Sequence, residues 1–243
     1  HMAYCDSSGY PTYVVNYTTG TLGSGVITFG NSYTVVSGDT DTPSVTVDTN
    51  GYPWVAYRHG NNGNVSKATY TNGSAWDTPS ILWTGTESDL SIVLSRQSSG
   101  KIYAIYRKGE SGALFGRLYN GTDWESQQNV NSGSNPCRFY GYSAVVDDNW
   151  YIHVEWADYA DGDLCYAWYN STADDWSSHT FLNELFNYCG GISINSTSQN
   201  LYAWYHRSDI IYYRKKVSGT WQSETLAWNR TVQNLCDGSF NVY

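Results

Sequence analysis

The stretch Tyr52–Arg58 reads YPWVAYR, and it returns as KIYAIYR at Lys101–Arg107, YIHVEW at Tyr151–Trp156 and NLYAWYH at Asn200–His206. Each copy alternates as a β-strand does and closes on an aromatic residue. The closing residues follow one another at intervals of 49, 50 and 49 positions: Tyr57, Tyr106, Trp156 and Tyr205. The chain is therefore expected to repeat one structural unit.

A second series has the same period. Its members are tryptophans that come shortly after turn-forming residues: Trp76, Trp124, Trp176 and Trp221. Two series with one period indicate a true repeat, and a period of about 40–50 residues with four strands per unit is typical of a β-propeller.

Each unit is expected to hold four strands, A to D, with strand B closing on the repeated aromatic residue. The sequence predicts strand A at Ser44–Val47, Leu90–Leu94, Tyr142–Val146 and Gly191–Ile194. Strand C is predicted at Val65–Tyr70, Ala113–Tyr119, Leu164–Tyr169 and Ile210–Lys215. Strand D is predicted at Ser80–Trp83, Gln128–Asn131, His179–Leu182 and Glu224–Trp228.

The two ends of the chain predict a fifth blade. Tyr10–Asn16, Gly25–Phe29 and Tyr33–Val36 are expected as strands B, C and D with no strand A before them, and Ser239–Tyr243 as a strand A with nothing after it. We therefore predict an all-β, five-bladed propeller of four antiparallel strands per blade, in which the N- and C-terminal strands share one blade and no sheet edge is left open there. The single domain spans 1–243, with blades at about 239–243 plus 10–37, 43–84, 89–131, 141–182 and 190–228. The alternative is an open stack of sheets or a sandwich.

Composition excludes several classes of protein. Charged residues make up 14% of the chain and the net charge is −9, which argues against nucleic acid as a partner because phosphate binding needs surplus Lys and Arg. No apolar run reaches the length of a membrane span. The opening His1-Met2 is typical of a cloning remnant, so the native N-terminus is expected to be missing. We expect a monomeric domain of a larger protein.

The cysteines and the glycosylation signals bear on location. The five cysteines fit no metal-ligand spacing. Cys137, Cys189 and Cys236 hold the same place in successive units, so a bridge Cys137–Cys189 or Cys5–Cys236 is predicted, with Cys165 as the free thiol. The Asn-x-Ser/Thr triplets are in mild excess, which favours an extracellular location: Asn16, Asn64, Asn72, Asn120, Asn170, Asn195 and Asn229.

The units resemble the degenerate repeats of the sialidase-like propeller superfamily, whose Asp-box reads Ser-x-Asp-x-Gly-x-x-Trp. The end of that box is present as Gly73-Ser74-Ala75-Trp76 and Gly121-Thr122-Asp123-Trp124, while Thr71 and Tyr119 stand at its Asp position. Blade number and length are also similar to those of tachylectin-2-type lectins. The resemblance implies a fold that serves both lectins and glycosidases and does not choose between them.

Scarce positive charge gathers in the predicted B–C loops, which carry Arg58-His59, Arg107-Lys108 and His206-Arg207. We expect Arg58, Arg107 and Arg207 to converge on the carboxylate of an acidic glycan, because the guanidinium fork matches it. The repeated aromatic residues and a neighbouring loop tyrosine would offer flat surfaces to sugar rings: Tyr57, Tyr106, Trp156, Tyr205 and Tyr159. In the alternative, these rings pack between blades and the arginines pair with acidic residues. Because the loops differ, one asymmetric site is predicted.

A glycoside hydrolase or polysaccharide lyase is the main alternative to a lectin-like module, and a protein-interaction scaffold is the third. A glycosidase needs two carboxylates about 5–10 Å apart, for which Glu155 and Asp158 are the candidates. A lyase would use His59 or His206 as base with Tyr205 as acid. No resident metal or cofactor is expected. A Ca²⁺ alternative would draw on acidic loop residues: Asp39, Asp41, Glu87 and Asp89.

Overall fold

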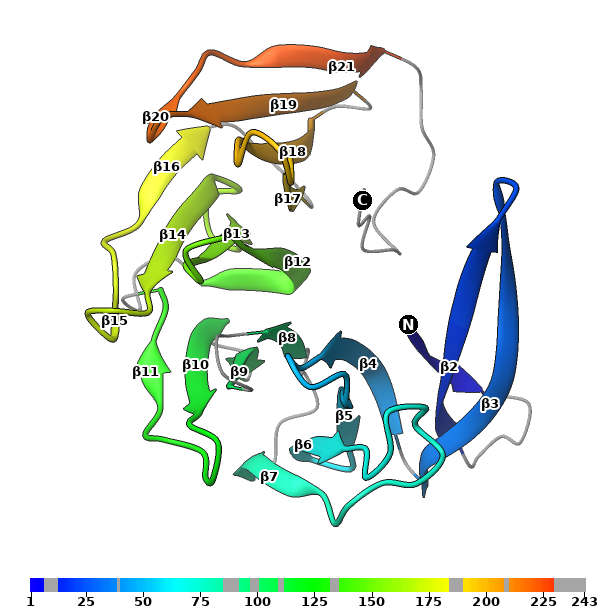
Figure 1. Ribbon diagram of the computed structural model, residues 1–243. Coiled ribbons are helices and arrows are strands. Elements are labelled where there is room, and N and C mark those ends of the chain that lie inside the picture. The colour runs from blue at the N-terminus through cyan, green and yellow to red at the C-terminus, as the bar shows by residue number, and fades with distance from the viewer. Residues whose placement is uncertain are drawn as a thin grey trace. The chain divides into compact units, whose positions relative to one another are not determined.

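The computed structural model describes residues 1–6, 13–38, 40–84, 92–96, 101–108, 112–131, 136–183, 190–207 and 210–229. Within these ranges the chain is all-β, with antiparallel sheets of three to five strands and no helix (Figure 1). It divides into two compact units, 1–110 with 115–128, and 111–114 with 129–243, so that the division runs through β10 and β11. None of the described segments is a helix able to cross a membrane.

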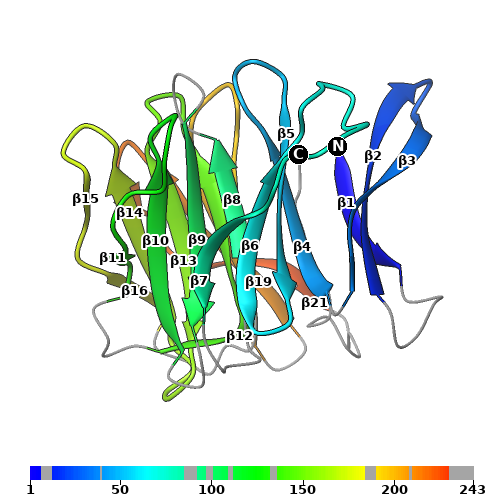
Figure 2. The same cartoon turned by 90° about the horizontal axis from the view of Figure 1, so that it is seen from below.

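The first unit holds three sheets. Their strands are β1 (Met2–Asp6), β2 (Tyr13–Gly23) and β3 (Val26–Gly38); β4 (Thr40–Val47), β5 (Pro53–His59), β6 (Asn62–Lys67) and β7 (Ser80–Thr84); and β8 (Ile92–Arg96), β9 (Ile102–Lys108), β10 (Ala113–Tyr119) and β11 (Gln128–Asn129). In each sheet, strands that follow one another in the sequence are hydrogen-bonded neighbours (Figure 2).

The second unit holds two sheets. Their strands are β12 (Cys137–Val146), β13 (Ile152–Asp158), β14 (Leu164–Asn170), β15 (Asp175–Trp176) and β16 (Thr180–Asn183); and β17 (Gly190–Ile194), β18 (Leu201–Arg207), β19 (Ile210–Val217), β20 (Thr220–Trp221) and β21 (Thr225–Asn229). In both sheets the last two strands pair side by side with the same third strand, β14 or β19.

The four predicted repeats are confirmed as four sheets with the predicted strand order. Strand B of each repeat becomes β5, β9, β13 or β18, and each is flanked by the expected strands A and C. Boundaries differ from the prediction by a few residues at most of the ends, because hydrogen bonding across a sheet, and not side-chain pattern alone, decides where a strand stops. The number of blades in the whole chain and their closure stay predictions.

The first sheet differs from the prediction. We expected no strand A before Tyr10–Asn16, but β1 pairs with β2 over five residues, from Met2 opposite Thr18 to Asp6 opposite Val14. The predicted strands C and D are one continuous strand, β3, which pairs along the whole of β2. Gly30-Asn31-Ser32 has the composition of a turn, but the ladder with β2 continues past it. The 13 residues of β3 pair with the 11 of β2 through register shifts between Val15 and Asn16 and between Thr18 and Gly20. The predicted strand at Ser239–Tyr243 lies outside the described residues.

The tryptophan series marks one recurring turn. Trp76 bridges to Ala68 and Trp124 to Tyr119, while Trp176 and Trp221 lie in β15 and β20. An asparagine side chain closes three of these turns by accepting the N–H of the residue two positions on: Asn72 from Ser74, Asn120 from Thr122 and Asn170 from Thr172, at 2.9–3.0 Å. Asn195 accepts from Thr197 in the same way. Four of the seven Asn-x-Ser/Thr triplets are therefore turn-closing residues.

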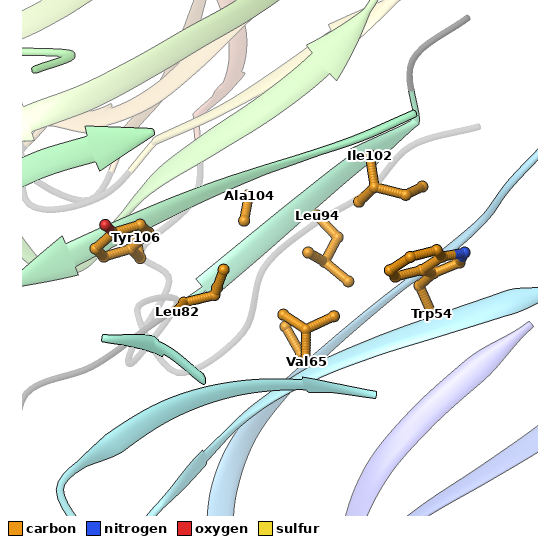
Figure 3. Packing of buried hydrophobic residues seen from close by; sticks show 8 residues of the cluster. Trp54, Val65, Leu82, Leu94, Ile102, Ala104 and Tyr106 are labelled. Carbon is orange, nitrogen blue, oxygen red and sulfur yellow. The ribbon is translucent and has the colours of Figure 1, made fainter. Parts of the chain in front are cut away.

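Within each unit, neighbouring sheets dock through buried aromatic and aliphatic side chains. Figure 3 shows this between the second and third sheets, where Trp54, Val65 and Leu82 meet Leu94, Ile102, Ala104 and Tyr106. Ring contacts join three pairs of neighbouring sheets, with distances between ring centroids. Tyr17 of the first sheet lies 5.4 Å from Trp76 of the second, Trp54 of the second 4.9 Å from Tyr119 of the third, and Tyr166 of the fourth 5.1 Å from Trp221 of the fifth.

Two arginines on third strands tie neighbouring sheets together. In β10, Arg117 donates to the backbone oxygens of Leu82 in β7 (2.8 Å), Glu125 (2.7 Å) and Trp124 (3.1 Å). In β19, Arg214 donates to the backbone oxygens of Leu182 in β16 and of Gln222. The two arginines are two repeats apart, so the contact is a recurring device of the fold.

Among the cysteines, Cys165 is a free thiol inside β14, as predicted. Burial raises its pKa, and the nearby carboxyl groups of Asp158, Asp163 and Glu155 add to the effect. Cys189 and Cys236 lie outside the described residues, so the two predicted disulfides stay predictions.

We predict that Arg117→Met lowers the free energy of unfolding by about 1.5–3 kcal/mol, because it keeps the apolar stem but leaves three carbonyl oxygens without their charged donor. For a chain of this size each kcal/mol corresponds to roughly 2–4 °C in Tm. Thermal denaturation followed by circular dichroism measures the shift. Lys215→Met is the control, because it removes the same charge from a lysine that lies over the ring of Tyr202. Equal Tm changes in both variants would contradict the role of Arg117 in joining the two sheets.

Candidate functional site

The repeated aromatic residues are core residues. Tyr57, Tyr106 and Trp156 are fully buried and Tyr205 nearly so. Each tyrosine is part of a cluster between two sheets. In the described structure their rings pack against other side chains between sheets, which is the alternative stated above. They do not offer open faces to a sugar.

Each of these buried phenols has a polar partner. Tyr57 Oη lies 3.0 Å from Ser66 Oγ, Tyr106 donates to Gln127 over 3.0 Å, and Tyr205 donates to Glu224 over 2.5 Å. Burial raises the pKa of Tyr57 and raises that of Tyr106 to about 12. These hydroxyl groups therefore act as hydrogen-bond donors or acceptors and not as bases near neutral pH.

The predicted cationic residues divide between the two units. Arg58, His59 and Arg107 belong to the first unit and Arg207 to the second. Arg107 is only 2% exposed, Arg58 is half-buried, and His59 is exposed beside Gly38. The structure describes each unit by itself, so the convergence of Arg58, Arg107 and Arg207 on one ligand stays a prediction.

Arg207 is the predicted residue with the best-defined surface chemistry. Its Nη2 lies 3.0 Å and its Nη1 3.4 Å from the Glu224 oxygens, which makes a forked ion pair. The guanidinium carbon sits 4.3 Å from the ring centroid of Tyr212. The pKa of Arg207 is raised mainly by its hydrogen bond with Tyr212, so it stays a cation.

The Arg207–Glu224 pair is held from beneath and open from outside. Tyr205 donates to Glu224, and the rings of Tyr205 and Tyr212 stack 6.0 Å apart. The side chains of Arg207 and Glu224 keep 23% and 30% of their surface exposed. Sequence reasoning missed Glu224, which lies 17 residues beyond Arg207 and reaches it only because β19 turns the chain back.

The candidate catalytic carboxyl groups are not brought together. Glu155 and Asp158 are three residues apart in β13, whose register with β14 is regular, so their side chains leave opposite faces of the strand. Asp158 is buried and accepts the backbone N–H of Ala160 at 2.8 Å, closing the turn after the strand. His206, half-buried on β18, lies on the opposite face of the strand from Tyr205.

Glu155 has an unusual environment for a carboxyl group. It is fully buried, and neither oxygen has a hydrogen-bond partner within the described chain. Its Oε1 lies against Gly190 of the neighbouring sheet, where a Cβ would collide with it. Burial raises the pKa of Glu155 well above its ordinary value, so the group is neutral where exposed glutamates are charged.

One further polar network joins the two sheets of the second unit. Asp147 Oδ2, His153 and Tyr166 form a chain of contacts of 3.2 and 2.7 Å, and Lys216 donates to the Tyr166 hydroxyl over 3.0 Å. Of the residues in the Ca²⁺ alternative, Asp39, Glu87 and Asp89 lie outside the described part of the chain. Its described part holds no group of three or more metal-binding side chains.

No known protein family matches the sequence, and no curated protein is similar to it in sequence. Solved structures do match. AofleA from Arthrobotrys oligospora, as a triple arginine-to-alanine mutant, is similar with a TM-score of 0.62 and 12% identity, over 96% of this chain and 72% of that one. A mutant of Aleuria aurantia lectin in complex with alpha-methyl-L-fucoside gives 0.59 and 12%, over 93% and 77%.

The NanB sialidase of Streptococcus pneumoniae gives a TM-score of 0.60 at 12% identity, over 80% of this chain and 32% of that one. Identities this low concern the fold alone. Together with the five antiparallel sheets of the described residues, they show that this chain has a propeller-type fold.

We predict that Glu155→Gln removes a pH dependence of stability. The folded-state pKa of Glu155 is raised, so the stability it permits is complete below the unfolded-state pKa, near 4.3, and falls as pH rises toward the folded-state value. Glutamine is neutral throughout, so the Tm of the variant should exceed that of the native chain at pH 7–8 and match it near pH 4. Thermal denaturation at a series of pH values measures the two curves.

Glu224→Gln serves as the comparison, since Glu224 is partly exposed and hydrogen-bonded. Parallel Tm-against-pH curves for the native chain and Glu155→Gln would contradict the buried, neutral state of Glu155.

Proposed function

We propose that this chain is an extracellular, lectin-like propeller that binds a carbohydrate at the Arg207–Glu224 pair. The observation that carries the proposal is an ion pair that is open to solvent yet fixed by two tyrosines. The fold shared with a fucoside-binding lectin supports it. A sialidase has a similar fold. Both the lectin and the sialidase are carbohydrate-recognising proteins, which also supports a carbohydrate ligand.

The chemistry of the pair suits sugar hydroxyl groups. A hydroxyl can accept from a guanidinium N–H and donate to a carboxylate oxygen at once, so neighbouring hydroxyls can bind across Arg207 and Glu224. Because Tyr205 and Tyr212 already hold the two side chains, little further side-chain freedom is lost on binding. Preorganisation of this kind distinguishes the pair from an ordinary surface ion pair, which contributes little.

The acidic glycan expected from the sequence faces a specific requirement at this pair. Two N–H groups of Arg207 already point at Glu224, so the carboxylate of a uronate or sialoside must share or replace them. Acidic and neutral sugars should therefore respond in opposite ways when Glu224 loses its charge.

We predict that Arg207→Ala weakens glycan binding about ten- to a hundredfold, as expected for a charge-assisted contact of about 1.5–3 kcal/mol. A glycan array covering neutral, uronate and sialylated sugars identifies the ligand, and titration calorimetry measures the change. Lys215→Ala, which removes a cation of β19 that stacks on Tyr202, should leave the affinity within about twofold. Full retention of binding by Arg207→Ala would overturn the assignment.

The charge of the sugar is settled by Glu224→Gln. A neutral sugar should bind this variant more weakly, because an acceptor oxygen becomes an amide, and an acidic sugar more tightly, because the competing carboxylate charge is gone. Incubating the native chain with the same glycans and looking for cleaved or unsaturated products tests the enzyme alternative. Turnover that survives Arg207→Ala would place the function elsewhere.

A further inference from the structure

The β2–β3 hairpin is longer than the sheet that it belongs to. β1 pairs only with Val14–Thr18 of β2, whereas β2 and β3 continue as a two-stranded ribbon to their turn, as Figures 1 and 2 show. Every residue from Gly20 to Ser32 is exposed. In the ribbon, the residues opposite one another on β2 and β3 are Gly20 and Phe29, Thr21 and Thr28, Leu22 and Ile27, and Gly23 and Val26.

This ribbon has one apolar face. Residues directly opposite one another in an antiparallel pair share a face, and so do alternate residues along a strand. Leu22, Ile27 and Phe29 therefore lie together, with 71%, 56% and 51% of their surfaces exposed. Gly20 completes the face: a Cβ there would come within 2.7 Å of Ile27 Cγ2 and 3.3 Å of the Phe29 ring, so both side chains lie flat over it.

The other face of the ribbon is of different composition. It carries Thr21, Thr28 and Val26, so threonine hydroxyls share it with one aliphatic side chain. The ribbon is thus amphipathic, and the three large apolar residues Leu22, Ile27 and Phe29 are gathered on one side. A contiguous exposed apolar patch of this kind marks an interaction surface more often than scattered apolar residues do.

The ribbon also lies in a part of the chain that has no charge. From residue 7 to residue 38 the sequence contains no Asp, Glu, Lys or Arg, although 14% of the chain is charged. Exposed sheet elements are usually protected from association by charged residues, above all lysine. No other described strand pairs with the outer edge of β3. This hairpin therefore lacks the protection that charged residues usually give against joining another sheet.

We propose that the apolar face of this hairpin, Leu22, Ile27 and Phe29 over Gly20, binds the same face of a second copy of this chain. A two-fold axis makes such a face self-complementary, since each side supplies the same side chains to the other. Two stacked ribbons pack about 10 Å apart, the ordinary spacing of sheets in a sandwich.

Charge favours a second copy over a membrane surface as the occupant. Two chains of net charge −9 repel each other, and the repulsion is least where they meet through a stretch without charge. Elements that lie on membranes commonly carry Lys and Arg toward anionic headgroups. This ribbon has none, and the chain as a whole is acidic.

The size of the surface sets the strength of the dimer. The exposed ribbon comprises fewer residues than the roughly 20–30 per side of a standard stable interface. Association should therefore be weak and concentration-dependent, with a dissociation constant in the range of about 10 μM to 1 mM.

Sedimentation velocity on the intact chain from about 5 to 500 μM tests the proposal, which predicts a shift from monomer to dimer. Phe29→Asp and Ile27→Asp place a charge on the contact face and should keep the chain monomeric at every concentration. Val26→Asp is the matched control: it puts the same charge on the opposite face of the same hairpin and should dimerise like the native chain. Thermal denaturation checks that all three variants fold.

Neutral Phe29→Ser separates loss of the apolar contact from plain repulsion and should raise the dissociation constant at least about tenfold. A native chain that is monomeric throughout, or a Val26→Asp variant that is as impaired as Phe29→Asp, would overturn the proposal. Flotation with phosphatidylcholine vesicles tests whether the apolar face binds a membrane instead. If the chain stays monomeric, binds the vesicles and loses that binding in Phe29→Ser, the face belongs to a membrane and the dimer proposal is wrong.

Discussion

The structure depends on the docking of one sheet onto the next. A twisted sheet of four short strands has two faces to cover, and none of these sheets can cover its own. Trp54, Val65 and Leu82 of one sheet are buried only because Leu94, Ile102 and Tyr106 of the next lie against them. The rings of the tryptophan turns extend this contact to the rim, and Arg117 and Arg214 fasten it through backbone oxygens. The need to bury each sheet against the next explains why apolar and aromatic residues recur in the sequence about every 49 positions.

The docking contact explains why aromatic residues that look like sugar platforms in the sequence are interior residues in the structure. Tyr57, Tyr106 and Tyr205 close their strands at the place where two sheets meet, so their rings are taken up by packing. Each phenol hydroxyl hydrogen-bonds one polar side chain, and for Tyr57 that partner, Ser66, is itself buried. In the last described sheet the partner is the partly exposed Glu224, which in turn forms the ion pair with Arg207. The candidate site is thus connected to the core by the hydrogen bond from buried Tyr205 to Glu224.

Much of the fold can be predicted from the sequence, because strand alternation and the repeat are properties of single strands. All four complete repeats form sheets with their strands in the expected order, and Cys165 is the expected free thiol. What the pattern misses is non-local. The role of β1 depends on pairing with β2, and a five-residue segment carries too weak a pattern to reveal its partner. The continuous strand β3 reads as two strands because the glycines of this hairpin imitate turns.

The candidate site is predictable only in part, for the same reason. Scarce positive charge points to Arg207, but Glu224 becomes its neighbour through the hairpin return of β19 and β21. The side-chain directions of Glu155 and Asp158 follow from strand alternation, yet what covers Glu155 is Gly190 of another sheet, which no local pattern reports.

The asparagine turns carry a consequence for how such a chain is processed. A turn closed by an Asn oxygen on the N–H of a Ser or Thr two positions later has the spelling of an N-glycosylation acceptor. The turn uses Oδ1, whereas an oligosaccharide is attached through Nδ2, and Asn72 and Asn120 are exposed. Expression in a eukaryotic secretory host would therefore decorate the turns between third and fourth strands with sugar, while bacterial expression would leave them bare. The asparagine turns that follow these strands thus make the chemistry of the protein's surface depend on the host in which the chain is expressed.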